Sequence, residues 1–198
     1  MKAIVFIDVQ NDFIDGALKN EKAIEVTPKI VDFAKSVMID VDRNTKLYAT
    51  LDTHKETVYD NVSVPKTAYN PELPLSGYMT TLEGRKLPVE HCIEGTRGWE
   101  IHDDLWEVIG GRCTCVPKNT FGSLDLAEII AEDSKGELEE IVICGFVTSI
   151  CVAANAVILR ARFPNVKITV KQDLCAGVTE NDHNNAIETL KMQMIDIA

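Results

Sequence analysis

The stretch that decides the fold reads Ile141-Val142-Ile143-Cys144, then Gly145-Phe146-Val147-Thr148-Ser149, and leads into a helical pattern that carries Cys151. Four consecutive apolar residues predict a strand that is buried on both faces. The helix is indicated by apolar residues at helical spacing, namely Val152, Ala153, Ala156, Val157 and Leu159. A strand that turns directly into a helix is the repeating unit of parallel sheets, so this stretch predicts an α/β fold.

The rest of the chain repeats this alternation of strand and helix. Further strands are predicted at residues 3–7, 47–51, 113–117 and 166–170, and helices at 27–41, 99–109, 123–132 and after 179. Thr27-Pro28 predicts the start of the first helix, because it offers a capping hydroxyl and a proline for the first turn. Thr179 and Asp182 resemble a capping box and predict the start of the last helix. This order favours a parallel sheet covered by helices on both faces, with ligands beyond the carboxyl ends of the strands.

The length and composition fit one folded unit. A chain of 198 residues with 45 % apolar residues can bury one sizeable core, so we expect a single domain over residues 1–198. Periodicity is lost between about residues 53 and 98, a stretch that includes Pro65, Pro71, Pro74 and Pro88. So long an irregular segment is usually functional or mobile.

Charge and hydropathy narrow the choice of partners and location. The chain carries 20 basic and 31 acidic side chains, and its formal net charge is −11. This balance argues against nucleic acid and anionic membranes as partners, because both need a basic face. The first apolar run ends at Asp8 and is too short for a signal peptide, so we expect a cytoplasmic protein. We therefore expect the six cysteines to be free, most of them as small buried residues.

Four predicted strands each end at a reactive side chain. Asp8 follows the first, Asp52 and His54 the second, Lys118 the third, and Cys151 begins the helix after the fourth. At a helix start the dipole favours the thiolate of Cys151, and a nearby Lys118 would favour it further. Asp8 can take the thiol proton, so the set predicts a cysteine nucleophile. Taken singly, Cys151 could be a buried apolar residue, Asp8 a loop cap and Lys118 a solvated lysine.

Asp52 and His54 also form a pattern of their own. On an extended segment, residues i and i+2 share a face, so both side chains can reach one ion. His91 lies in the same irregular loop and could supply a third ligand. Two imidazoles and a carboxylate suit zinc, iron or manganese. The alternative is a loop aspartate and histidine bonded to backbone. His102 and His183 have no such neighbours in the sequence and are interpreted as surface helix residues.

These residues together resemble the isochorismatase-like cysteine hydrolase superfamily, and within it the nicotinamidases. The similarity covers nearly the whole chain, and it is carried by Asp8-Val9-Gln10-Asn11-Asp12-Phe13, Asp52-Thr53-His54, Pro88-Val89-Glu90-His91-Cys92, Lys118 and Gly145-Phe146-Val147-Thr148-Ser149-Ile150-Cys151-Val152. The resemblance implies a three-layer α/β/α sandwich, Rossmann-like, around a mostly parallel six-stranded sheet. It also implies hydrolysis of a primary amide, typically nicotinamide to nicotinic acid and ammonia.

The resemblance further implies a role for each matched residue. Cys151 would be the nucleophile, Asp8 the general base and Lys118 the residue that positions both. A cis peptide would join Phe146 to Val147, and the backbone amides of Val147 and Cys151 would form the oxyanion hole. The expected metal ligands are Asp52, His54 and His91, with Glu83 as a candidate fourth, and zinc is the first choice over iron or manganese. The expected pocket walls are Phe13 and Phe121, and the candidates for stacking on the substrate ring are Tyr78 and Trp99.

One residue departs from the family pattern, because Ser149 stands where an aspartate is usual. Two alternatives therefore stay open at the level of the sequence. The chain could hydrolyse a different amide within the same superfamily, or it could be an inactive metal-binding scaffold of the same fold. We also expect a homo-oligomer that acts on a small-molecule amide.

Overall fold

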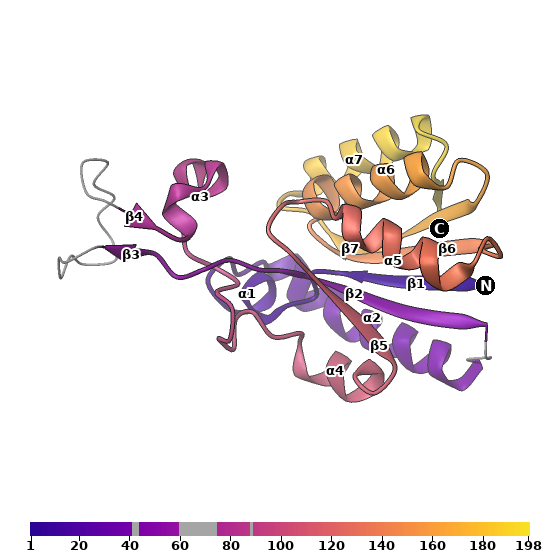
Figure 1. The fold of residues 1–198 in the computed structure, drawn as a ribbon, viewed down its shortest axis with the longest axis horizontal. Coiled ribbons are helices and arrows are strands. Elements are labelled where there is room, and N and C mark those ends of the chain that lie inside the picture. Colours follow the sequence, from indigo (N-terminus) through magenta and orange to yellow (C-terminus); the bar gives the residue numbers. More distant parts are fainter. Residues whose placement is uncertain (41–43, 60–74, 88) are drawn as a thin grey trace.

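The computed structural model describes residues 1–40, 44–59, 75–87 and 89–198. Within them, a six-stranded parallel sheet has the strand order β5-β2-β1-β6-β7-β8 (Figure 1). Its strands are β1 (Lys2–Ile7), β2 (Thr45–Asp52), β5 (Cys113–Lys118), β6 (Glu140–Phe146), β7 (Lys167–Ala176) and β8 (Asp196–Ile197). The five strands predicted from the sequence are confirmed. The sixth, β8, has only two residues and gives no pattern of its own.

Helices cover both faces of this sheet, which confirms the three-layer α/β/α sandwich (Figure 1). The helices α2 (Glu21–Asp40) and α4 (Asp103–Ile109) lie on one face. The helices α5 (Leu124–Ser134), α6 (Ala153–Arg162) and α7 (Glu180–Met192) lie on the other. Residues 3–7 of the central strand β1 are at most 1 % exposed, which explains why they are all apolar.

The helix starts show where capping signals hold and where they mislead. Ser123 caps α5 by accepting from the backbone N–H of Leu126, and Thr179 caps α7 as predicted. The predicted start of α2 at Thr27 is wrong. The helix begins at Glu21, with Asn20 Oδ1 accepting from the N–H groups of Lys22 and Ala23, and it runs through Pro28.

The start of α4 is also later than the pattern from Trp99 suggests. The residues before Asp103 instead join the segment after β1 by backbone contacts. The N–H of Asn11 donates to the carbonyl of Glu100, and Gln10 forms an antiparallel bridge with Ile101. These contacts tie the loop to the short helix α1 (Asn11–Ile14) at the edge of the sheet.

The predicted irregular segment contains several short elements where it is described. They are β3 (Val58–Tyr59), β4 (Leu75–Ser76), the 3₁₀ turn η1 (Tyr78–Thr80) and α3 (Leu82–Lys86). β3 and β4 pair antiparallel as an arm at one end of the molecule (Figure 1). Pro65, Pro71, Pro74 and Pro88, and Val41 at the end of the first predicted helix, lie outside the described residues.

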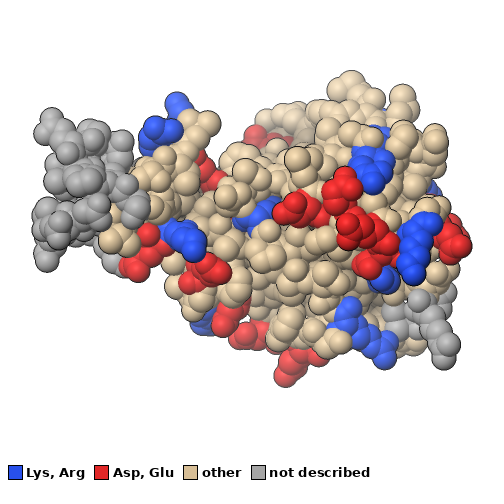
Figure 2. Space-filling view, viewed as in Figure 1, with Lys and Arg blue, Asp and Glu red and all other residues tan. Residues whose placement is uncertain are grey.

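The surface carries both signs of charge on the face drawn in Figure 2. Acidic side chains, in red, alternate there with lysines and arginines, in blue. Within the part of the chain that the structure describes, none of the helices combines the length and the apolar character that a membrane crossing requires. All six cysteines lie in this part and are free thiols, as expected.

Candidate active site and metal centre

The carboxyl ends of β1 and β5 and the turn after β6 bring Asp8, Lys118 and Cys151 together at one edge of the sheet. Asp8 follows β1, Lys118 ends β5, and Cys151 lies in the π-helical turn η2 (Thr148–Val152) after β6. Lys118 Nζ lies 2.7 Å from Asp8 Oδ2 and 3.6 Å from Cys151 Sγ. Asp8 is fully buried, and the other two residues are 6 % exposed. The structure thus joins a thiol, an ammonium and a carboxylate that are all largely buried.

Asp8 is held in an uncommon backbone conformation by a residue that sequence reasoning missed. Its φ is 47°, in the left-handed region. Thr50 on β2 donates its hydroxyl to Asp8 Oδ1 at 2.6 Å and accepts from the Asp8 N–H at 3.1 Å. A threonine inside an apolar strand is ordinary in a sequence, so no signal marked this contact.

The protonation of the three groups follows from competition between burial and charge. Burial raises the pKa of the Cys151 thiol well above its usual value, and the Asp8 carboxylate adds to this effect while Lys118 opposes it. Burial also raises the pKa of Asp8 against the opposing charge of Lys118. Burial alone would lower the pKa of Lys118, but the neighbouring anionic groups raise it overall. Desolvation therefore opposes the low thiol pKa that the helix start and Lys118 led us to expect for Cys151.

The turn that carries Cys151 has the backbone that the resemblance implies. The peptide bond between Phe146 and Val147 is cis. The N–H groups of Ile150 and Val152 both donate to the carbonyl of Val147, which folds the turn back on itself. Ser149, which replaces the usual aspartate, is exposed, whereas Cys151 two residues later is buried. The departure from the family pattern thus lies on an exposed position of the turn.

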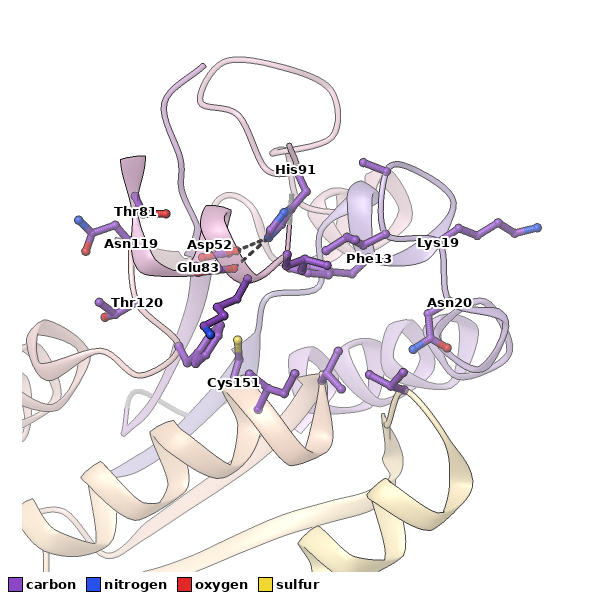
Figure 3. Close-up of a pocket in the computed structure, with 18 of the residues that line it drawn as sticks. Phe13, Lys19, Asn20, Asp52, Thr81, Glu83, His91, Asn119, Thr120 and Cys151 are labelled. Carbon is purple, nitrogen blue, oxygen red and sulfur yellow. Dashed lines mark ion pairs between the residues drawn. The ribbon is translucent and has the colours of Figure 1, made fainter. Parts of the chain in front are cut away.

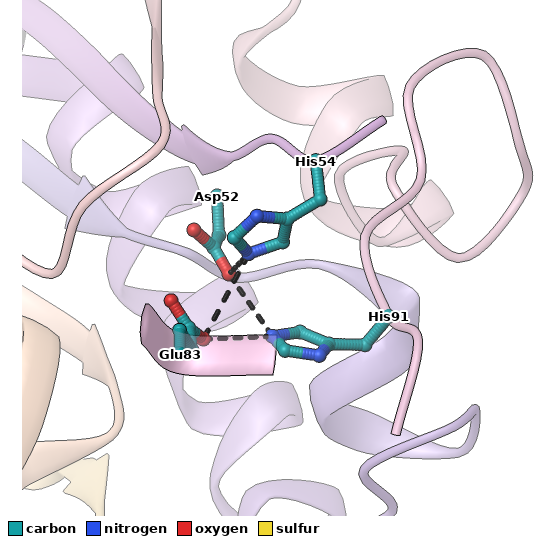
Figure 4. A group of neighbouring side chains, drawn as sticks. All are labelled: Asp52, His54, Glu83 and His91. Carbon is teal, nitrogen blue, oxygen red and sulfur yellow. Dashed lines mark hydrogen bonds and ion pairs between the residues drawn. The ribbon is translucent and has the colours of Figure 1, made fainter. Parts of the chain in front are cut away.

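A second cluster lies beside the thiol and consists of Asp52, His54, Glu83 and His91 (Figure 4). His54 Nε2 and His91 Nε2 lie 3.0 Å and 3.2 Å from Asp52 Oδ2. Glu83 Oε1, from α3, lies 3.8 Å and 3.4 Å from the same two nitrogens. All four ligand atoms lie within 4.8 Å of one another. The structure therefore brings together the three expected ligands and the candidate fourth.

The chemistry of this cluster fits a divalent cation. His91 Nδ1 lies 2.9 Å from the carbonyl of Val89, and a proton on Nδ1 leaves the lone pair of Nε2 facing the cluster. Asp52 Oδ1 is buried and has no hydrogen-bond partner among the described residues. Mixed imidazole and carboxylate donors suit zinc, iron or manganese.

Thiol and cluster open into one cavity of about 1420 Å³ (Figure 3). Asp52, Glu83 and His91 line it together with Val147 and Cys151. Figure 3 shows the sulfur of Cys151 pointing into the cavity toward Asp52 and Glu83. A molecule bound here can therefore contact the thiol and a metal ion at the same time.

The aromatic residues near the cavity divide into walls and supports. Phe13 and Phe121 line the cavity as expected; Phe13 is buried with its ring centroid 5.7 Å from that of His91, and Phe121 is 46 % exposed. Tyr78 and Trp99 do not line it. Tyr78 packs behind the cluster, with centroids 4.8 Å from His54 and 5.2 Å from His91. Trp99 Nε1 donates to Thr53 Oγ1 at 2.9 Å, between Asp52 and His54 in the sequence. Both candidates for ring stacking therefore contact residues of the site outside the cavity.

Three further polar residues hold the site, and the sequence did not mark them. The buried side chain of Gln10 accepts from the Asp52 N–H and donates to the Asp52 carbonyl. Asp12 accepts from the N–H of Cys92, beside His91. Asn155 accepts from the N–H of Ser123 at 2.9 Å and donates to the carbonyl of Cys151 at 2.8 Å. Each of these three side chains thus bonds to the backbone of a segment that carries a site residue.

The prediction that His183 lies on the surface changes, whereas most cysteines are buried as expected. His183 is half-buried, and its Nδ1 lies 2.9 Å from Thr148 Oγ1 in the turn of Cys151. Cys92, Cys144 and Cys175 are buried as expected, but Cys115 is exposed and Cys113 half-buried. A hydrogen bond with Cys113 lowers the pKa of Cys115 to about 7.

Comparisons with known proteins agree with this geometry. The chain is 26 % identical over 223 residues to the nicotinamidase of Saccharomyces cerevisiae, and the alignment covers 100 % of this chain and 99 % of the relative. Among solved structures, it resembles a pyrazinamidase of Pyrococcus horikoshii in complex with zinc, with a TM-score of 0.75, 22 % identity and coverage of 100 % and 98 %. A nicotinamidase/pyrazinamidase of Bacillus subtilis gives a TM-score of 0.72, 23 % identity and the same coverage. The isochorismatase domain matches residues 2–198, so the chain belongs to the isochorismatase family.

Proposed function

We propose that this protein hydrolyses nicotinamide to nicotinic acid and ammonia through a thioester on Cys151. The observation that carries the proposal is one cavity lined both by Cys151 and by Asp52, Glu83 and His91 of the metal cluster. Lys118 contacts the thiol of Cys151 and the carboxylate of Asp8 next to this cavity. The likeness to a curated nicotinamidase over the full length of both chains supports the same substrate.

The first half of the reaction forms the thioester. Asp8 takes the proton of the Cys151 thiol, and the sulfur attacks the amide carbonyl carbon. Lys118 lies within 4 Å of both groups, so its positive charge stabilises the anion whether it resides on Asp8 or on the sulfur. The backbone N–H groups of Val147 and Cys151 are assigned to the oxyanion, each contributing on the order of 3 kcal/mol.

The second half releases the products. Protonated Asp8 gives its proton to the leaving nitrogen, the carbon–nitrogen bond breaks, and ammonia departs. Water then attacks the thioester, with Asp8 accepting a proton from it. The carbon–sulfur bond breaks, and Asp8 returns this proton to the sulfur of Cys151. The sum of both halves is one amide and one water converted to one carboxylic acid and one ammonia, with Cys151 and Asp8 restored.

Asp52, His54, Glu83 and His91 would hold one divalent ion, and we propose zinc. The mixed donor set supports this choice, and so does the zinc described in the pyrazinamidase of Pyrococcus horikoshii. When bound, the ion would supply a Lewis-acid contact for the ring nitrogen of the substrate. Phe13 and Phe121 would provide the apolar walls against the ring.

Ammonia release from nicotinamide tests the proposal directly. The purified protein should produce ammonia and nicotinic acid in equal amounts, and treatment with a chelator should reduce the rate. Ammonia from other primary amides but not from nicotinamide would favour a different amidohydrolase of the family. A protein that releases ammonia from none of them, and whose Cys151 forms no adduct with substrate by mass spectrometry, would be an inactive scaffold. Four further expectations stay predictions: a single domain, a homo-oligomer, a cytoplasmic location and no nucleic-acid or membrane partner. Light scattering can test the oligomer, cell fractionation the location, and binding assays the partners.

A further inference from the structure

His183 reaches from the last helix to the turn that carries the reacting thiol. Its Nδ1 lies 2.9 Å from the hydroxyl oxygen of Thr148, which is fully buried. Thr148 is the first residue of η2 and directly follows the cis peptide between Phe146 and Val147. The helix α7 packs against this turn, so the bond joins two elements that lie side by side.

The bond does not depend on how the ring is protonated. A threonine hydroxyl donates to an unprotonated Nδ1, and it accepts from Nδ1 when that nitrogen carries a proton. The contact can thus hold the turn in either tautomer and in the charged form of the imidazole.

Thr148 lies between the two residues whose N–H groups face the oxyanion in the proposed mechanism, Val147 and Cys151. The side chain of Thr148 forms the hydrogen bond between this turn and His183 of α7. A displacement of about 1 Å in a catalytic group can cost about 100-fold in rate. Loosening this bond should therefore affect the transition state more than it affects the binding of substrate.

The surroundings of His183 fix the position of the ring as well. A Cβ on Gly177 would lie 2.9 Å from the Cβ of His183, so the segment before α7 packs closely against the histidine. Asn20 Nδ2 donates to the carbonyl of Gly177 at 2.9 Å, and Asn20 also caps α2. The backbone segment that packs against His183 is thus tied to the start of α2.

We propose that His183 is a positioning residue, which holds the turn of Cys151 in its reactive geometry through the hydroxyl of Thr148. The effect on the reaction rests on the proposed function, whereas the effect on the turn itself does not.

The test compares H183L, which removes the hydrogen bond, with H183N, whose side-chain amide can replace Nδ1 as a bonding partner. N184L, which places a leucine at the next, exposed position of α7, is the matched control. With nicotinamide, H183L should lower kcat by about 10-fold to about 100-fold with KM within about 2-fold of wild type, because the turn acts in the transition state. H183N should recover most of the rate, and N184L should match wild type.

Two further measurements separate positioning from a general loss of structure. Amide hydrogen exchange of residues 147–152 should be faster in H183L than in wild type, and close to wild type in H183N. T148V should lose as much rate as H183L, and the double variant should lose no more than either alone, because both remove one bond.

Several outcomes would overturn the inference. These are wild-type kcat in H183L, a loss that H183N does not reverse, or losses in T148V and H183L that add fully. If wild-type protein releases no ammonia from nicotinamide, the proposed function fails, and the exchange comparison alone decides whether His183 holds the turn. Equal exchange in wild type and H183L then counts against it.

Discussion

At the scale of single residues, the protonation of the Cys151 thiol depends on its burial and on the charges of Asp8 and Lys118. Burial raises the pKa of the thiol more than Lys118 lowers it, which favours transfer of the proton to Asp8 as the sulfur attacks. Lys118 bonds to both acceptors of negative charge, at 2.7 Å and 3.6 Å. The transfer therefore moves the anion from one side of a fixed ammonium to the other, and little reorganisation is needed.

Replacement of Cys151 by alanine tests the assignment of the nucleophile. A methyl group cannot attack a carbonyl, so kcat/KM for nicotinamide should fall by at least about 1,000-fold while the fold is kept. The measurement is ammonia release, with circular dichroism as the check on folding. The matched control is Cys144→Ala, a buried thiol in β6 outside the cavity, which should keep its activity. If C144A lost the chemistry while folded and C151A kept it, the assigned thiol would be the wrong one.

Alkylation by iodoacetamide should single out Cys115 near neutral pH. Its thiol is exposed and its pKa is lowered to about 7, so its thiolate fraction grows as the pH rises through that value. Cys151 should react slowly over this range, because its raised pKa keeps it protonated. Peptide mass spectrometry across about two pH units centred on 7 gives both rates, and Cys115→Ser should remove the fast one. Faster labelling of Cys151 would show that Lys118 outweighs burial.

The sequence predicts those site residues that follow a strand directly. Asp8, Asp52 and Lys118 could be found because each ends an apolar run at the carboxyl edge of the sheet, and Cys151 because it lies where the helix after β6 begins. Residues that act from inside a strand or a helix could not, since Thr50 and His183 look like ordinary members of their elements. Their roles depend on which elements lie side by side, and periodicity carries no such information.

At the scale of elements, α2 shows why a local signal can fail. Thr27-Pro28 has the chemistry of a helix start, but the Thr27 hydroxyl donates to the carbonyl of Ala23 within an existing helix. Ala23, Val26 and Ile30 are buried on the face that packs toward the core, so the burial of this face outweighs the missing N–H of Pro28. Strand positions were easier to predict, because buried parallel strands are continuous apolar runs.

The end of β6 needs a glycine where it passes β1. Gly145 has a φ of 125°, and a Cβ there would lie 2.1 Å from the backbone oxygen of Ile7. Gly145→Ala should therefore lower the free energy of unfolding by about 3 kcal/mol or more. Urea denaturation measures the change. Gly111→Ala is the control, since nothing lies within 4 Å of its added Cβ, and it should change stability by less than about 0.5 kcal/mol. Equal stabilities of the two variants would contradict the close approach of β1 and β6.

At the scale of the whole molecule, the metal cluster joins segments that lie far apart in the sequence. Asp52 ends β2 and His54 follows it, Glu83 lies in α3, and His91 lies in the loop that leads toward α4. An ion bound by all four would link α3 to the sheet. Ligand binding to the folded state alone stabilises it, by about 2.7 kcal/mol at a ligand concentration 100 times Kd.

Zinc should therefore raise the Tm of the protein after dialysis against a chelator. The rise should disappear in His54→Ala and persist in Cys151→Ala, because the thiol is not among the four ligands. Differential scanning calorimetry with and without the ion gives the shift, and elemental analysis should find about one ion per chain. A Tm that does not respond to zinc in the wild type, or that responds equally in H54A, would argue against this site.

The two borders of the main sheet have a consequence for how copies of this chain meet. On one side β5 ends in Pro117 and Lys118, and a proline cannot extend a ladder of backbone hydrogen bonds. On the other side β8 is only two residues long. Both edge strands therefore disfavour pairing with a strand of another copy, which is the step that builds amyloid. Self-association that keeps this fold should therefore avoid these two borders of the main sheet, and concentrated solutions should stay free of thioflavin-positive fibrils.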